Sequence, residues 1–96
     1  MIIQGWNADH IVTDAQAAKL QDDIMTLMTD HYTIPNGDEV QGAAFSWVVN
    51  ELRQRFGWRN LGSVSRDFEN LFKALGFVTI RGARNRRGNI AEIVTL

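Results

Sequence analysis

The eight residues "KALGFVTI", Lys73 to Ile80, contain the change of periodicity that decides the predicted fold. Before Gly76 the apolar residues recur at helical spacing, and after it they alternate as in a β-strand. A glycine at such a boundary is typical of the residue that follows a helix. The stretch therefore predicts a helix that ends at Leu75 and leads directly into a strand.

The helix before this junction is predicted over residues 64–75. Its apolar residues recur at spacings of three and four, as on one face of an α-helix: Val64, Phe68, Leu71, Phe72 and Leu75. Because successive residues turn by about 100°, the opposite face centres on Arg66, Asn70 and Lys73. We expect the first face to pack against the core and the second to carry hydrogen-bonding groups.

The chain after the junction is predicted as a β-hairpin over residues 77–95. Its two strand-like segments flank "RGARNRRGN", residues 81–89, which holds four arginines. Glycine and asparagine suffice for the geometry of a turn, whereas clustered arginines repel one another. The arginines therefore favour a function at the hairpin tip over simple solvation.

Upstream of the junction the pattern predicts an N-terminal arm and two further helices, over residues 1–12, 14–31 and 40–56. Thr13 and Gln16 fit a capping box at the start of the first helix. Pro35 and the turn chemistry around Gly37 interrupt the helical pattern between the two. The expected architecture is α+β, with a three-helix core followed by a C-terminal hairpin.

Composition indicates one globular domain over residues 1–96. Hydrophobic residues make up 45% of the chain and charged residues 22%, with one proline and no cysteine. Such values are typical of folded domains, and the lack of cysteine excludes a disulfide framework and favours a reducing compartment. No apolar run approaches the roughly 18 residues of a membrane span. We expect a soluble, cytoplasmic protein with no membrane partner.

The charges divide the chain into two halves. Residues 1–51 hold one cation and eight acids, a net charge of −7, and residues 52–96 hold nine cations and three acids, a net charge of +6. Eight of those nine cations are arginine, whose planar guanidinium suits phosphate and guanine. The basic half is thus predicted to meet a polyanion, and the acidic half to face solvent or a basic partner. Charges that merely solvate different faces are the alternative.

Enzymatic activity is not predicted. His10 and His31 are 21 residues apart, which is outside metal-ligand spacing, so no metal is expected. The stretch "GARNRRG" lacks the Lys and Ser/Thr of a phosphate-binding loop and precedes a strand instead of a helix. Adjacent acids such as Asp22 and Asp23 point about 100° apart on a helix, so they are poorly placed to act together in acid–base catalysis. No cofactor is expected either.

The element order and the "KALGFVTI" junction resemble the winged helix-turn-helix DNA-binding superfamily, over about Asp14 to Leu96. The resemblance implies that the third helix enters the major groove and that the hairpin wing lies along the backbone or in an adjacent minor groove. It also implies a homodimer, with the first helix and the N-terminal arm as the expected interface. The implied function is a small, nucleoid-associated transcriptional regulator that recognises a DNA sequence.

Residue chemistry agrees with this assignment. Arg66 and Asn70 are the side chains expected to read base edges, while the hairpin arginines supply affinity that does not depend on sequence. The full set of predicted DNA contacts is Arg59, Asn60, Ser63, Ser65, Arg66, Asn70, Lys73, Arg81, Arg84, Asn85, Arg86 and Arg87. Plain solvation of a polar helix face is the alternative for the helical members of this set.

Three charged side chains near this set carry expectations of their own. Glu69 could read cytosine, repel the DNA backbone or pair with Lys73 one turn later, and the pair is favoured. Arg53 and Arg55 are expected to be solvated or to pair with Glu51 or with aspartates of the first helix.

A second function also fits the charge pattern. A small phage- or plasmid-type winged-helix inhibitor would bind a protein target through its acidic N-terminal half, by mimicking nucleic acid or by gripping a basic surface. Steep salt dependence of DNA binding would favour the regulator, and a 1:1 protein complex that survives loss of the hairpin arginines would favour the inhibitor.

Overall fold

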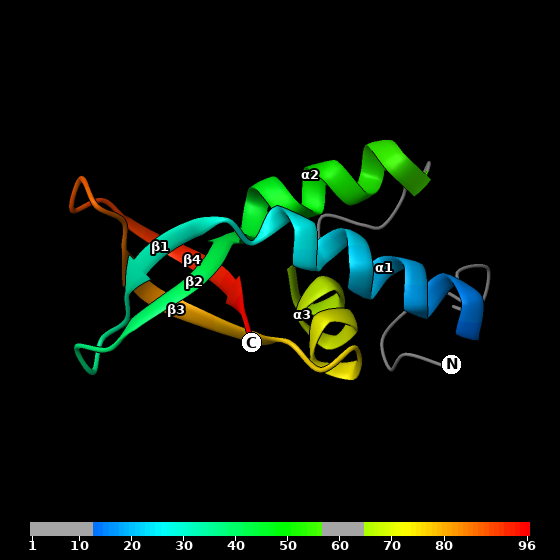
Figure 1. The fold of residues 1–96 in the computed structure, drawn as a ribbon, viewed down its shortest axis with the longest axis horizontal. Coiled ribbons are helices and arrows are strands. Elements are labelled where there is room, and N and C mark those ends of the chain that lie inside the picture. Colours follow the sequence, from blue (N-terminus) through cyan, green and yellow to red (C-terminus); the bar gives the residue numbers. More distant parts are fainter. Residues whose placement is uncertain (1–12, 57–64) are drawn as a thin grey trace.

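A computed structural model describes residues 13–56 and 65–96, which form an α+β fold of three helices and a four-stranded antiparallel sheet (Figure 1). The elements are α1 (Asp14–Leu27), β1 (Asp30–Thr33), β2 (Glu39–Ala44), α2 (Phe45–Phe56), α3 (Ser65–Ala74), β3 (Val78–Arg84) and β4 (Ile90–Thr95). The predicted N-terminal arm and the predicted contacts Arg59, Asn60 and Ser63 lie outside the described residues.

The strands follow the order β1-β2-β4-β3, and each neighbouring pair is antiparallel. A further pair between Thr33 of β1 and Arg84 of β3 closes the sheet into a small barrel. The three helices gather at one end of the molecule, and the turns of both hairpins lie at the other (Figure 1). The arginine-rich loop, residues 85–89 between β3 and β4, therefore lies at the end of the sheet opposite the helices.

The first helix begins as the sequence predicts. The Thr13 hydroxyl accepts a hydrogen bond from the Gln16 amide at 3.1 Å, and the Gln16 side chain accepts one from the Thr13 amide at 2.9 Å. This is the expected capping box, which satisfies amides that have no partner within the helix. The helix then buries an apolar stripe made of Ala17, Leu20, Ile24 and Leu27.

Two predicted helix boundaries are wrong. The helix expected over 14–31 ends at Leu27, and the helix expected over 40–56 begins at Phe45. The residues between them form the hairpin β1–β2, so the turn chemistry around Gly37 joins two strands instead of two helices. Strand pairing is the reason: at Gly42, an added Cβ would lie 2.5 Å from the Val94 carbonyl oxygen of β4, a closeness that only glycine permits.

The junction between α3 and β3 confirms the prediction from "KALGFVTI". Gly76 has a φ of 92°, and its amide donates to the Lys73 carbonyl at 3.1 Å. The Phe77 amide donates to the Phe72 carbonyl at 2.9 Å, which completes the glycine-based helix terminus known as a Schellman motif. Phe77 is itself buried, so the chain enters β3 at an angle set by the core.

Two apolar clusters hold the described residues together. The larger lies among the helices and the adjoining end of the sheet, where the rings of Phe45 and Phe72 meet edge to face at 5.5 Å. It contains every described apolar residue predicted for α3, namely Phe68, Leu71, Phe72 and Leu75. The smaller cluster joins Tyr32, Ala83 and Ile93 between the hairpins. This second cluster fixes the arginine-rich loop relative to β1.

Candidate nucleic-acid interface

The tip of the β3–β4 hairpin is held in shape by its own hydrogen bonds. The Asn85 side-chain oxygen accepts from the amides of Arg87 and Asn89, both at 2.9 Å. The Gly88 amide donates to the Asn85 carbonyl at 2.9 Å, and Gly88 adopts a φ of 82°, which favours glycine. Asn85, predicted as a DNA contact, thus has its side-chain oxygen committed to the loop.

The four arginines of the predicted tip have different surroundings. Arg84 donates through Nη1 to the Gly88 carbonyl at 2.9 Å, so its guanidinium also braces the loop. Arg86 and Arg87 are exposed, and within residues 13–56 and 65–96 neither forms an ion pair. A pre-shaped loop that presents two unpaired guanidiniums is suited to phosphate, because little conformational entropy is lost when it binds.

The face of α3 predicted to read bases lies at the surface, with its members exposed to different degrees. Arg66 and Lys73 are exposed and Asn70 is half-buried, while Ser65 is the first residue of the helix. Asn70 and Lys73 border a groove of about 380 Å³ between α3 and β3, where Thr79 lies on the opposite wall. The structure therefore places Asn70 and Lys73 beside a groove, and Arg66 on the exposed surface of α3.

Arg81 differs from the other predicted contacts because it forms ion pairs with two carboxylates. Its Nη2 lies 3.3 Å from Glu69 Oε1 and its Nε lies 3.7 Å from Glu92 Oε2. The expected pairing of Glu69 with Lys73 is therefore wrong, since the strand supplies a nearer cation than the helix does. Burial raises the pKa of Glu92, as do a hydrogen bond with Glu69 and its charge, while Arg81 opposes the rise.

The cations of α2, Arg53 and Arg55, contact neighbouring side chains. Arg55 pairs with Glu51 at 3.6 Å and with Asp23 of α1 at 3.7 Å, which confirms the expected pairing. The guanidinium of Arg53 lies 5.4 Å from the centre of the Phe68 ring, within cation–π distance. Both arginines stabilise the packing of α2 against its neighbours.

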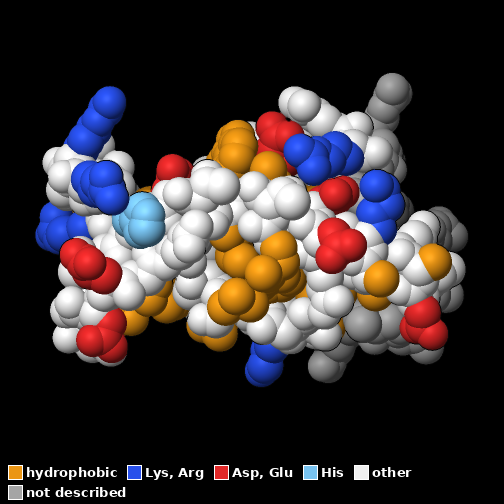
Figure 2. Space-filling view, viewed as in Figure 1, with side chains coloured by type: hydrophobic (Ala, Val, Ile, Leu, Met, Phe, Trp, Pro, Cys, Tyr) orange, Lys and Arg blue, Asp and Glu red, His pale blue; other side chains and the backbone are white. Residues whose placement is uncertain are grey.

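The acidic first half and the basic second half of the sequence are not separated in space at the end of the molecule that holds the hairpin turns. Asp30 of β1 borders the same hollow as Arg86 and Arg87, and Glu39 of β2 borders a smaller one with Arg84. Figure 2 shows positive and negative side chains together at this end of the molecule. The cause is the Thr33–Arg84 pair, which joins the acidic and the basic halves of the chain.

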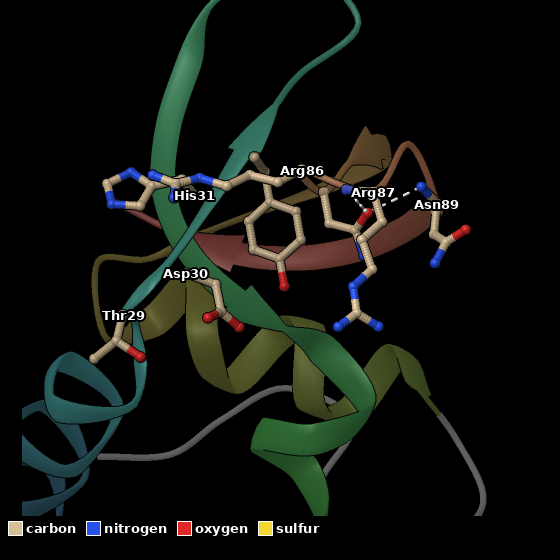
Figure 3. Close-up of a pocket in the computed structure, with 8 residues that line it drawn as sticks. Thr29, Asp30, His31, Arg86, Arg87 and Asn89 are labelled. Carbon is tan, nitrogen blue, oxygen red and sulfur yellow. Dashed lines mark hydrogen bonds between the residues drawn. The ribbon is translucent and has the colours of Figure 1, made fainter.

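The larger of these hollows was not predicted. It has a volume of about 510 Å³ and lies between the start of β1 and the β3–β4 loop (Figure 3). Its walls include Asp30, His31, Arg86, Arg87 and Asn89. The sequence pattern predicts residues 28–31 to be helical. A helix at that place would not pair with the strand that leads into the arginine-rich loop, so the pattern does not predict the hollow.

Searches for a metal site and for a membrane-spanning helix cover the described part of the chain only. Within it, no three His, Cys, Asp or Glu residues gather as a metal site would require, and no helix has the length and apolarity to cross a membrane. Comparisons with protein-family models, with curated proteins and with solved structures find no match. The chemistry of the residues themselves is therefore the guide to function.

Proposed function

We propose that the protein is a non-enzymatic, sequence-specific double-stranded DNA-binding protein that acts as a small transcriptional regulator. The observation that carries this proposal is the arginine-rich tip: a loop braced by Asn85 and Arg84 that presents Arg86 and Arg87 without acidic partners among the described residues. Phosphate neutralisation by such side chains supplies most of the affinity that is independent of sequence.

The face of α3 would supply the specificity. Arg66 would bind guanine O6 and N7, Asn70 would bind adenine N6 and N7, and Lys73 would bind guanine or a phosphate. The three residues share one face of α3 by their spacing. Asn70 and Lys73 also border the groove between α3 and β3. This arrangement supports insertion of α3 into the major groove, as the winged helix-turn-helix resemblance implies.

The proposal separates positioning residues from contact residues. The proposed DNA contacts within the described residues are Ser65, Arg66, Asn70, Lys73, Arg86 and Arg87. Arg84 and Asn85 shape the loop, and Arg81 is neutralised by Glu69 and Glu92 until one of these carboxylates is protonated or displaced. A homodimer in the cytoplasm, bound to two half-sites about one helical turn apart, completes the proposed assembly.

The test is a selection of bound sequences from random duplex DNA at near-physiological salt, followed by sequencing. An enriched motif, present as an inverted repeat, is the expected result. Arg87→Ala should weaken retention of every sequence, whereas the matched control Lys19→Ala, which removes an exposed cation of α1, should not. Absence of any retained duplex would overturn the proposal and would favour the protein-binding inhibitor.

A further inference from the structure

The hollow beside the arginine-rich loop has the size and the wall chemistry of a ligand site. Its volume of about 510 Å³ lies within the range of roughly 300 to 1,000 Å³ found for small-molecule pockets. It joins residues that are more than fifty positions apart in the chain, because β1 pairs with β3 at Thr33 and Arg84. The duplex-binding proposal makes no use of the β1 wall.

The two walls differ in chemistry. On the β1 wall, Asp30 offers a carboxylate, which only accepts hydrogen bonds when ionised. On the loop wall, Arg86 and Arg87 offer only donors. Figure 3 shows that the charged ends of Asp30 and Arg87 project to the same side, while the side chain of Arg86 extends toward His31. A ligand between Asp30 and Arg87 therefore needs donors on one edge and acceptors on another.

We propose that this hollow binds a single unpaired guanine nucleotide. Guanine carries two adjacent donors, N1–H and the N2 amino group, which match the two oxygens of Asp30. Its neighbouring edge carries O6 and N7, two acceptors that match the guanidinium of Arg87. Arg86, on the His31 side, is then placed to bind the phosphate of the same nucleotide.

No other common base presents this combination of edges. Adenine and cytosine each have one amino group and no second donor beside it, and uracil and thymine have a single N–H between two carbonyl oxygens. A carboxylate therefore gains two hydrogen bonds from guanine and at most one from the others. Discrimination by such a bidentate contact amounts to about 1–3 kcal/mol, or about a 5- to 150-fold difference in Kd.

The guanine must be unpaired, since base pairing in a duplex occupies the N1–H and N2 donors. Single-stranded loops and ends, or a free nucleotide, leave these donors available, and proteins commonly read such splayed bases on this edge. The inferred activity is thus distinct from duplex recognition by α3. It uses the β1 wall, which has no role in the duplex proposal.

Tyr32 supports this reading of the pocket. Its ring is buried between the hairpins, and it contributes to the lining of the hollow. Burial raises the pKa of the Tyr32 phenol, and the charge of Asp30 raises it further, so the hydroxyl remains protonated. The hollow therefore retains a neutral hydroxyl beside the carboxylate, able to donate to or accept from a bound nucleotide.

The test is a titration of the ¹⁵N-labelled protein with 5′-GMP, followed by NMR, with inosine 5′-monophosphate as the matched ligand. Inosine lacks only the N2 amino group, so GMP is expected to bind about tenfold more tightly, with shifts at Asp30 and Arg87. AMP, CMP and UMP should bind no better than inosine monophosphate. Equal affinities for GMP and inosine monophosphate would overturn the proposal without the use of any variant.

Variants give a second, independent measurement. Asp30→Asn should remove the preference for GMP, while Asp22→Asn, an exposed change on α1, should keep it. If Asp30→Asn folds and still prefers GMP, Asp30 does not read the base and the proposal fails. If GMP, inosine monophosphate, AMP, CMP and UMP all bind equally and Arg86→Ala abolishes binding, the hollow recognises only phosphate. That result would also overturn the proposal.

Two further measurements distinguish a nucleic-acid strand from a free nucleotide as the ligand, and guanine binding from duplex binding. An oligothymidylate with one central guanine, compared with the all-thymidine strand, shows whether a nucleic-acid strand or the free nucleotide is preferred, and the guanine requirement is tested in both. Duplex binding is measured on the same variants, and Asp30→Asn should leave it unchanged. If the wild-type protein prefers GMP but binds no duplex, only the proposed regulator fails. If it binds duplex DNA but does not prefer GMP to inosine monophosphate, only the proposed guanine site fails.

Discussion

Glu69 on α3 and Arg81 on β3 form an ion pair with 3.3 Å between Oε1 and Nη2. The pair links the helix proposed to read DNA bases to the strand that leads into the arginine-rich loop. It joins the helix and the strand that meet at Gly76, so it adds an electrostatic contact between two elements whose connection the helix terminus already shapes. The same pair also withholds the positive charge of Arg81 from a phosphate.

Glu69→Gln is expected to strengthen DNA binding, because it removes a negative charge from α3 and leaves Arg81 freer to contact a phosphate. One added phosphate contact should steepen the slope of log K against log salt by about 0.9. Stability should change by less than about 1 kcal/mol, since the Arg81 side chain is 80% exposed. Fluorescence anisotropy over a salt series measures the slope, and an unchanged slope would remove Arg81 from the interface.

The raised pKa of Glu92 predicts a pH-dependent stability. The folded state holds the Glu92 proton more tightly than the unfolded chain, whose pKa is near 4.5. The contribution of Glu92 is therefore fully present below about pH 4.5 and is lost as the pH rises through the raised pKa of the folded state. Urea unfolding of wild type and Glu92→Gln from pH 4 to 7 isolates it. As the pH rises, the free energy of unfolding of wild type should fall relative to that of Glu92→Gln.

Asn85→Ala should lower the free energy of unfolding by about 1–2 kcal/mol, because two loop amides lose their acceptor. It should also weaken DNA binding, although no charge is removed, since Arg86 and Arg87 lose their fixed positions. Asn85→Asp keeps an acceptor oxygen and should restore much of the stability while it still weakens DNA binding by its charge. Chemical denaturation and anisotropy measure both quantities. Equal DNA affinity of wild type and Asn85→Ala would show that loop shape is irrelevant to binding.

Two glycine substitutions should differ in cost for different reasons. Gly42→Ala places a Cβ 2.5 Å from the Val94 carbonyl oxygen, so β2 and β4 must separate, at a cost of about 2 kcal/mol or more. Gly88→Ala meets no atom within 4 Å and should cost only about 1 kcal/mol for its positive φ. Urea denaturation of the two variants measures the order. A reversed order would contradict the close approach of β2 and β4.

Arg66→Ala and the double change of Arg86 and Arg87 to Ala should affect DNA binding in different ways. Loss of Arg66 should cost about 1–3 kcal/mol at one base pair and change the preferred sequence. Loss of the two loop arginines should weaken binding to all sequences and reduce the salt slope by about two units. Affinities for a panel of single-base operator variants distinguish the two outcomes. If both proteins match wild type on every duplex, the DNA-binding proposal fails.

Local features of this chain follow from residues that are close together in the sequence. The capping box at Thr13 and the helix terminus at Gly76 each depend on contacts within about five residues, and the apolar face of α3 follows from the spacing of residues within the helix. The intrahelical pair expected for Glu69 failed because a cation from a strand twelve residues away lies within reach. Proximity along the chain is a reliable guide only when no distant partner competes.

The sequence by itself determined the α+β class, the third helix with its polar face and the position of the arginine-rich tip, because periodicity and turn chemistry are local properties. Only the tertiary structure decided that residues 30–33 and 39–44 are strands: they pair with each other across the turn at Gly37, and β2 also pairs with β4 and Thr33 with Arg84 of β3, about fifty residues away. The same pairing brought Asp30 to Arg86 and Arg87 and formed the hollow. Strand pairing is a contact between distant segments, and no pattern within either segment specifies the other.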